Sequence, residues 1–450
     1  MGIFNSRYLL IAGLLVHLLY MTSLGTGIIN EFFYDSSHFQ KGQASDFFVF
    51  YNASRLLLKQ KSIYGSQDAD TPHMYGRYSY IPTFVFLTAW IGFFKPYASY
   101  ILWIVLIETS LIASIILSLK WKKKHGFQIS DNFLVFLWLI PSPYYLELFM
   151  GQNTFLFAFL LFVFLLSQDL FRGRWIGFIS FSLSIISKIA SIIYIPLFFR
   201  KKQYAIILAP LVFTAVTSAF YFTVMDTARV TIQGSSSYVS ENIKTGKSIY
   251  KMPMAAKADK TDETVHIKSP VNFSVRLPRG IYITLNHILK KPQSLYYPQV
   301  PGFSSLFYNI TGSIDLFRLS AIIMWIAVYS LLMFRPGDYI LDFSLLIMLF
   351  FITFTFIWEH HYTLLIPFMV LIIIREPSVR LPMVAAYLLV SAPTPFMLYN
   401  PALLGWISME HNLIKGLFYY LPKSSAVIIG FSALLYLKFS KIRNLHEETA

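Results

Sequence analysis

The chain has 450 residues, 56% of them hydrophobic and 13% charged, and it contains no cysteine, which excludes thiolate nucleophiles, disulfides and cysteine metal sites. Because the apolar residues form repeated long blocks rather than amphipathic stripes, this composition indicates an integral membrane protein. The formal charge of +15 is spread over short basic clusters between the blocks, which favours lipid phosphates over nucleic acid as the partner.

The apolar blocks predict the helices. The first block, residues 8–29, follows Arg7 and is too long for the core of a signal peptide, so we expect it to remain as the first membrane span. A shorter block at 79–94 begins with aromatic residues and a proline, as in an interfacial segment, and we expect it along the outer surface. The other blocks are 98–119, 132–149, 153–167, 175–199, 204–224, 315–334, 339–357, 362–374, 381–398 and 424–440.

The block at 175–199 is interrupted by Lys188. A single helix would place this ammonium near the bilayer centre, at a cost of about 2.5–3.5 kcal/mol. Two half-length helices that meet at Lys188 avoid the cost if the lysine lies at the floor of a water-filled cavity. This arrangement also places every short basic cluster on the cytoplasmic side. The sequence therefore predicts an all-α polytopic membrane protein with about twelve membrane segments, including the pair of half-helices, and with both termini in the cytoplasm.

We expect a single integral-membrane domain over residues 1–450 with two longer outer loops. Residues 30–97 form the first outer loop, with juxtamembrane helices. Residues 226–312 form a long polar loop, in which a periodic pattern of apolar residues resumes from Val271 to Leu289. This pattern predicts a mobile loop followed by a surface helix.

The first outer loop contains an acidic residue and two tyrosines as candidate site residues. Asp46 opens the stretch "SDFFVFYNASRLL", where Ser45 can cap a helix that begins at Asp46 and the helix dipole favours the ionised carboxylate. Such a carboxylate can act as a general base, or it can merely cap an interfacial amphipathic helix. Tyr78 and Tyr80 are candidates for substrate binding, although alone they indicate an aromatic belt.

Two further candidates lie where membrane segments meet. Gln152 and Asn153 lie in a short turn, where they can bind sugar hydroxyls or form a polar hairpin turn. Lys188 needs an anionic partner, for which phosphate is suitable, unless its chain snorkels to an interface. Glu108, within another span, is either the counter-ion of Lys188 or the partner of His17.

The stretch "FIWEHHYTLL" places Glu359, His360 and His361 between two apolar blocks. Neighbouring histidines point in different directions on a helix, and a metal-binding spacing is absent. One histidine can bind phosphate or a hydroxyl; the alternative is interfacial anchoring by Trp358 and Tyr362. Because no cluster of acids is expected on the outer side, we expect neither a metal nor another cofactor.

The order of these motifs resembles glycosyltransferase family 87, the polyprenyl-phosphate-sugar-dependent mannosyltransferases of the GT-C fold. The resemblance covers roughly residues 8–375, and it rests on Asp46 followed by "FYNASRLLLKQKSIYG", "YSYIPTFVFL", "GQNTFLFAFLLF", "SIISKIASIIYIPLFFRKKQY" and "WEHHY". It implies that Asp46 is the catalytic base and that Lys188 lies near the donor phosphate, although Ile189-Ala190 replaces the usual proline motif. One of His360 and His361 would match the late histidine of the family, and His361 is favoured because it precedes a tyrosine.

The resemblance implies that a hexose, mannose in the family, is transferred with inversion from a polyprenyl-phosphate donor to a hydroxyl of a glycolipid or glycan. This would take place at the outer face of the bacterial cytoplasmic membrane. The expected partners are the donor, the acceptor and the lipid bilayer, and the expected substrate-binding residues are Gln152, Asn153, Tyr78, Tyr80 and Glu359.

Two other functions remain as alternatives. A lipid-linked sugar flippase or transporter predicts broken helices in both halves, whereas only one interrupted block is present. A glycan polymerase or ligase would share the outward-facing site, and the 226–312 loop offers Arg229, Arg276 and Arg279 for it.

Overall fold

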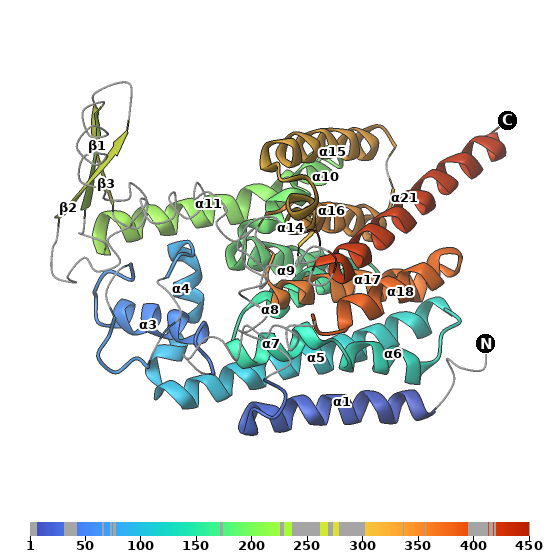
Figure 1. Ribbon diagram of the computed structural model, residues 1–450, viewed down its shortest axis with the longest axis horizontal. Coiled ribbons are helices and arrows are strands. Elements are labelled where there is room, and N and C mark those ends of the chain that lie inside the picture. The colour runs from blue at the N-terminus through green and yellow to red at the C-terminus, as the bar shows by residue number, and fades with distance from the viewer. Residues whose placement is uncertain are drawn as a thin grey trace. The chain divides into compact units, whose positions relative to one another are not determined.

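The described part of the protein is almost entirely helical in the computed structural model, with one small sheet (Figure 1). The chain divides into two compact units, and each is described by itself. Unit 1 comprises Met1–Ala44, Ile101–Pro210 and Pro292–Ala450, and unit 2 comprises Ser45–Tyr100 and Leu211–Lys291. The structure describes residues 7–30, 43–64, 67–72, 74, 78–171, 174–225, 229–235, 262–268, 273–278, 302–335, 337–355, 357–394, 413, 417 and 420–449.

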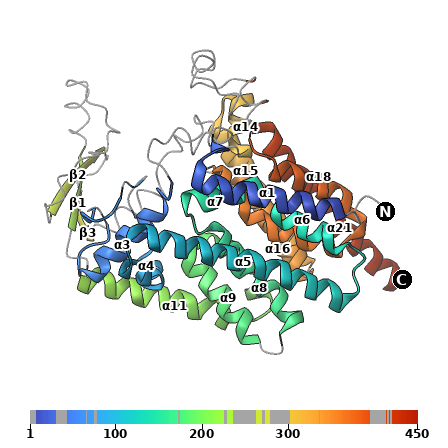
Figure 2. The same ribbon diagram turned by 90° about the horizontal axis from the view of Figure 1, so that it is seen from below.

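Unit 1 is a bundle of helices around a core of leucine, isoleucine and phenylalanine. Within it, α8 packs against α9, α18 against α21, and α1 against α6, the last pair lying side by side in Figure 2. Its elements are α1 (Arg7–Thr26), α5 (Pro96–His125) from Ile101 onward, α6 (Asp131–Leu139), α7 (Ser142–Met150), α8 (Thr154–Leu170), α9 (Arg174–Ser187), η4 (Ile189–Tyr194), α10 (Ile195–Arg200), the start of α11 (Tyr204–Phe220), α14 (Phe303–Thr311), α15 (Ile314–Phe334), α16 (Tyr339–Thr353), η7 (Glu359–Leu365), α17 (Ile366–Arg375), η8 (Pro377–Val379), α18 (Arg380–Ser391) and α21 (Leu421–Thr449).

Five helices in the described part of the chain are long and apolar enough to cross a membrane. They are α1, α5, α11 with its extension to Met225, α15 and α21, and a sixth span results if α6 and α7 are counted together. The prediction of a helical polytopic membrane protein is therefore confirmed, whereas the number of twelve segments stays a prediction.

The structure divides the predicted block 132–149 into two helices, α6 and α7, which meet at a bend of 45°. Pro141 lies at the break and Pro143 follows it. Proline lacks the N–H group that would continue the helical ladder, and it disfavours helical geometry in the residue before it. The bend therefore follows from the sequence, although the hydrophobicity of the block conceals it.

The break at Lys188 is confirmed. Helix α9 ends at Ser187, Lys188 has extended backbone angles (φ −149°, ψ 122°), and the 3₁₀-helix η4 begins at Ile189. The block 175–199 is therefore not one continuous helix, as the cost of burying an ammonium in mid-span led us to expect.

Unit 2 joins the segment after residue 44 to the later part of α11. Its helices are α3 (Phe47–Leu58), α4 (Pro82–Thr88) and η3 (Ala89–Phe93), followed after α11 by the π-helical turn η5 (Tyr221–Met225). The hydroxyl of Tyr221 accepts a 2.7 Å hydrogen bond from the backbone of Ile63, and Thr83 Oγ1 lies 2.6 Å from Thr217 Oγ1. These contacts fix the 59–64 segment and α4 against α11.

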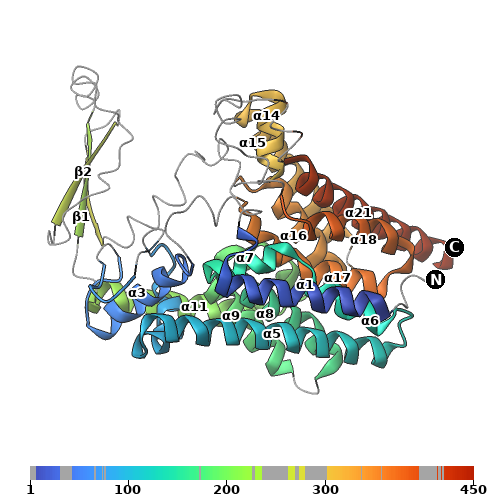
Figure 3. The same cartoon turned by 60° about the horizontal axis from the view of Figure 1, so that its bottom comes forward.

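Unit 2 also contains a three-stranded sheet in the order β2-β1-β3, and Figure 3 shows β1 and β2 side by side. The strands are β1 (Arg229–Ser235), β2 (Asp262–Lys268) and β3 (Phe273–Pro278), with β1 parallel to β2 and antiparallel to β3.

The sheet corrects one expectation, the helix over Val271 to Leu289. Residues 273–278 form a strand, and the remainder of that predicted helix lies outside the described residues. The sequence "FSVRLP" alternates apolar and polar side chains with the period of two that a strand requires, and the helical reading overlooked it. The 226–312 segment does contain a helix, α14, but it begins only at Phe303.

Candidate active site

The ammonium of Lys188 lies at the start of α8. Its Nζ donates a 2.7 Å hydrogen bond to the hydroxyl of Thr154, the first residue of that helix. The neighbouring Asn153 is 1% exposed, and its amide donates to the carbonyl oxygen of Ser187 (3.4 Å). Asn153 and Thr154, at the start of α8, thus bind the last residue of α9 and the lysine that follows it. The structure therefore brings together Asn153 and Lys188, which the sequence analysis had selected separately.

The turn that carries Gln152 and Asn153 has a defined geometry. Gly151 ends α7 in the left-handed region (φ 68°), which glycine adopts without steric cost. The backbone carbonyl of Gln152 accepts from the indole N–H of Trp103 (3.2 Å). Asn153 Oδ1 is buried and has no hydrogen-bond partner in the described part of the protein, so it is available to a ligand donor.

A buried carboxylate that the sequence analysis missed lies beside this turn. Glu147 on α7 is 0% exposed, and its Oε1 accepts a 2.8 Å hydrogen bond from the backbone N–H of Phe155 in the first turn of α8. An acidic side chain is favourable at a helix N-terminus. The signal in the sequence was a lone glutamate within an apolar block, "YYLELFM".

The two histidines begin the short helix η7, which packs against α7 and α8. Nδ1 of His361 accepts a 3.1 Å hydrogen bond from the backbone N–H of Trp358. The ring of His360 is 3% exposed and lies 4.4 Å from that of His361, and in the described part of the chain neither of its nitrogens has a hydrogen-bond partner. His360 therefore offers a buried imidazole with both nitrogens available to a ligand.

The environment of His360 keeps its ring neutral. Burial, together with the positive charge of Lys188, holds the pKa of His360 well below its ordinary value. Thr154, which accepts from Lys188, begins α8, and η7 packs against α8, so Lys188 and His360 lie in one region of unit 1. A neutral imidazole can donate through one nitrogen and accept through the other.

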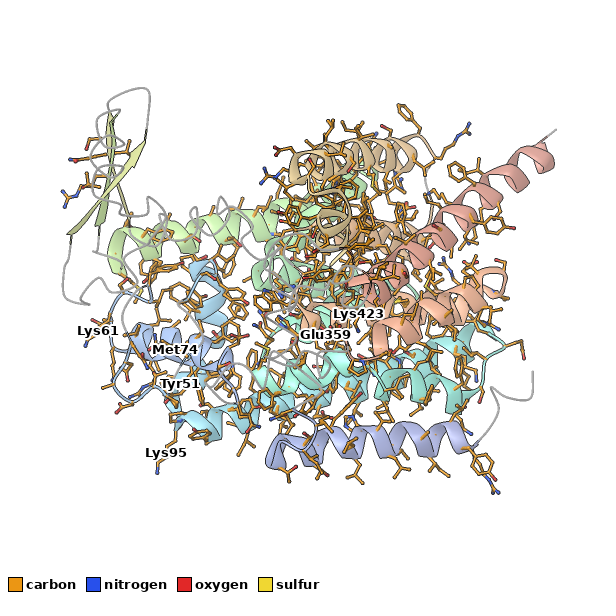
Figure 4. All side chains as sticks on the ribbon, in the orientation of Figure 1. Tyr51, Lys61, Met74, Lys95, Glu359 and Lys423 are labelled. Atoms are coloured by element: carbon orange, nitrogen blue, oxygen red, sulfur yellow. The ribbon has the colours of Figure 1, made fainter. Side chains whose placement is uncertain are left out.

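Glu359 is fully buried and already has partners within the protein. Its Oε1 lies 2.9 Å from Nζ of Lys423 at the start of α21 (Figure 4), and its Oε2 accepts from the hydroxyl of Thr394. Lys423 also donates to the carbonyl oxygens of Val390 and Ala392. The predicted substrate-binding role of Glu359 stays a prediction, but the carboxylate has a clear role in joining η7 to α21.

The structure resolves the alternative for Glu108. Its Oε2 lies 3.1 Å from Nε2 of His17 on α1, and its Oε1 accepts a 2.9 Å hydrogen bond from the hydroxyl of Tyr144. Glu108 is therefore the partner of His17.

Asp46, Tyr78 and Tyr80 belong to unit 2. Helix α3 begins at Phe47, so Asp46 takes the N-cap position and the expected helix start at Asp46 is wrong by one residue. The side chain of Asp46 is 8% exposed and makes no capping hydrogen bond to its own helix. The Asp46 carboxylate is therefore not committed to helix capping, the role that had been the alternative to catalysis.

The two tyrosines lie in a cluster of aromatic side chains. Tyr78 is 2% exposed and donates from its hydroxyl to the carbonyl of Ile81 (3.0 Å), while the ring of Tyr80 packs against Phe50 and Phe84. Their role in substrate binding stays a prediction, as does the proximity of Asp46 to the Lys188–His360 group of unit 1.

No curated protein and no solved structure matches the chain. The model of glycosyltransferase family 87 matches residues 78–238. This range includes the candidate residues Tyr78, Tyr80, Gln152, Asn153 and Lys188, but it does not include Asp46, His360 or His361. The match indicates a glycosyltransferase. The resemblance of this chain to glycosyltransferase family 87 is thereby confirmed.

Proposed function

We propose that the protein transfers a hexose from a polyprenyl-phosphate donor to a hydroxyl of a glycolipid or glycan at the outer face of the bacterial cytoplasmic membrane. Mannose is the first sugar to test, because it is the sugar that the resemblance implies. The observation that carries the proposal is the buried, unpartnered imidazole of His360 close to the ammonium of Lys188. A lipid phosphate provides the charge and the acceptor oxygens that such a pair can bind.

In the proposed reaction the acceptor hydroxyl loses its proton to the carboxylate of Asp46. The acceptor oxygen forms a bond to the anomeric carbon from the side opposite the phosphate. The bond between that carbon and the phosphate oxygen breaks, and its electron pair leaves with the polyprenyl phosphate. A single displacement of this kind inverts the configuration at the anomeric carbon.

Lys188 and His360 would act on the leaving group. The ammonium meets the phosphate charge in the ground state, and the interaction strengthens as negative charge develops on the departing oxygen. A neutral His360 can donate a hydrogen bond to that oxygen without adding a second buried positive charge. We propose His360 for this role rather than His361, because Nδ1 of His361 already accepts from Trp358.

The test is incubation of the purified protein with polyprenyl-phosphate hexoses and a membrane lipid extract as acceptor, with free polyprenyl phosphate and the product linkage as readouts. We expect release of polyprenyl phosphate together with an inverted glycosidic bond. Movement of the intact donor across the vesicle bilayer, without release of polyprenyl phosphate, would instead identify a flippase. Transfer of a preassembled glycan rather than one hexose would identify a polymerase or ligase.

A further inference from the structure

Helix α14 (Phe303–Thr311) buries polar side chains in its first turn. Ser304 and Ser305 are both 0% exposed, whereas Ile310 is 54% exposed. The helix packs against α15, α16 and α21 within unit 1. Serines at the buried side of a short helix need an explanation, because apolar residues would stabilise the same packing at lower cost.

The hydroxyls of Ser304 and Ser305 have no hydrogen-bond partner in the described part of the chain. Within a helix, a buried serine commonly donates to the carbonyl four residues earlier, as Ser344 does to Ile340 (2.6 Å). Ser304 and Ser305 lie too close to the start of α14 for this, because the helix has no carbonyl four residues before them. The backbone N–H of Ser305 donates to the carbonyl oxygen of Gly302 (3.1 Å), whereas the N–H groups of Phe303 and Ser304 have no carbonyl of the helix three or four residues before them. Hydroxyl and backbone donors are thus concentrated in the first turn of α14.

The start of α14 lies against the segment that leads to His360. A Cβ atom placed on Gly302 would lie 3.2 Å from Cβ of Ile357 and 3.5 Å from Oγ of Ser304. Oγ of Ser304 is therefore folded back over the N-terminal end of the helix. Ile357 precedes His360 by three residues, so their Cα atoms are at most about 11 Å apart.

We propose that Gly302-Phe303-Ser304-Ser305, the first turn of α14, binds a phosphoryl group carried by a lipid. The N-terminus of a helix carries partial positive charge and presents N–H donors to anions. The two buried hydroxyls add further donors. A phosphoryl group accepts several hydrogen bonds at once.

The inference deepens the proposed function and rests on it. The phosphoryl group is that of the polyprenyl-phosphate donor or that of a phosphate-bearing acceptor lipid, and both have the same recognition chemistry. In either case α14 supplies neutral donors near the His360 segment, in addition to the charge of Lys188.

The test compares Ser304→Ala/Ser305→Ala with the wild type and with Thr311→Ala. Thr311 is a matched control, because it lies in the last turn of α14 and its hydroxyl donates to the backbone carbonyl of Phe307 (2.9 Å). Binding of polyprenyl phosphate, of polyprenol without phosphate and of phosphatidic acid is measured on purified protein. We expect the double variant to bind polyprenyl phosphate about tenfold more weakly, from the loss of hydrogen bonds to a charged group. Binding of polyprenol should not change.

The outcomes distinguish a donor phosphate, an acceptor phosphate and the absence of a phosphate site. A loss for polyprenyl phosphate assigns the turn to the donor, and a loss for phosphatidic acid alone assigns it to an acceptor phosphate. Equal affinities of the variant, the control and the wild type for both phosphate lipids overturn the proposal and leave water as the partner of the serines. If the double variant fails to fold, the single variants Ser304→Ala and Ser305→Ala are compared in the same way.

The binding assay also separates this inference from the proposed function. Weaker phosphate binding by the double variant, with no sugar transfer by the wild type, would refute the transfer reaction but support the phosphate site. Normal transfer with an unchanged KM for donor and acceptor in the double variant would refute the phosphate site alone.

Discussion

Replacement of Lys423 by methionine would leave the carboxylate of Glu359 in a buried site without its cation. The two groups are 1% and 0% exposed and lie 2.9 Å apart, which corresponds to an attraction of about 6 kcal/mol at an effective dielectric constant of about 20. Much of this attraction offsets the cost of removing both charges from water. Removal of one partner of such a pair typically costs about 3–5 kcal/mol, because the other charge stays buried and unpaired.

The double variant Lys423→Met/Glu359→Gln should recover most of this loss. A glutamine retains an oxygen that can accept from Thr394, and no buried charge then remains. We expect the double variant to be at least about 2 kcal/mol more stable than Lys423→Met, because the carbonyl oxygens of Val390 and Ala392 lose their donor equally in both variants. The pair is thus expected to show a coupling energy of at least about 2 kcal/mol in a double-mutant cycle.

The measurement is reversible unfolding in mixed micelles, with Lys441→Met as the control. Lys441 lies on the same helix and pairs with Glu376 at 2.7 Å, but the lysine is 44% exposed. Because Arg375 also pairs with Glu376 (2.7 Å), we expect the loss of Lys441 to cost about 0–1 kcal/mol. If Lys423→Met were no less stable than Lys441→Met, or the double variant no more stable than Lys423→Met, the account of the pair would be wrong.

The remaining predictions concern the proposed chemistry. Asp46→Asn should lower turnover at least about 100-fold, since general-base action contributes about 10²–10⁴-fold, while equilibrium binding of the donor stays normal; near-normal turnover would remove Asp46 as the base. Lys188→Met should weaken both donor binding and turnover, and a variant with an unaltered KM and kcat would contradict a role at the phosphate. Because the folded-state pKa of His360 is lowered, the unfolded chain binds the extra proton first, and stability should fall as the pH drops below about 6.5. In His360→Gln this part of the acid destabilisation should be absent, and unfolding curves of the two proteins from pH 7.5 to 5 that shift in parallel would refute it.

The sequence predicted the structure correctly where one energetic cost decides the conformation of a segment. The position of most helices followed from the apolar blocks, and the break at Lys188 followed from the expense of an ammonium within a span. The same reasoning could not reveal Lys423, because a lysine at the edge of an apolar block is compatible with an interfacial position. Its burial depends on Glu359, which is distant in sequence.

Other features depend on pairings that one sequence does not specify. His17 and Lys188 were equally reasonable partners for Glu108, and the packing of α1 against the rest of unit 1 decides between them. The sheet was missed for a different reason, because its strands are short and the two-residue alternation of β3 was read within a longer helical window. The start of α3 was predicted one residue too early, because sequence patterns rarely specify the terminal residue of a helix.

The linked contacts of Asn153 with Ser187 and of Thr154 with Lys188 make the length of α9 part of the site. Deletion of one residue from α9 would rotate the chain beyond its C-terminal end by about 100° and shift it by about 1.5 Å. The hydrophobicity of the segment would barely change, yet the ammonium would leave the start of α8. Chain length between Arg174 and Lys188 is therefore as strict a requirement for placing this charge as the lysine itself.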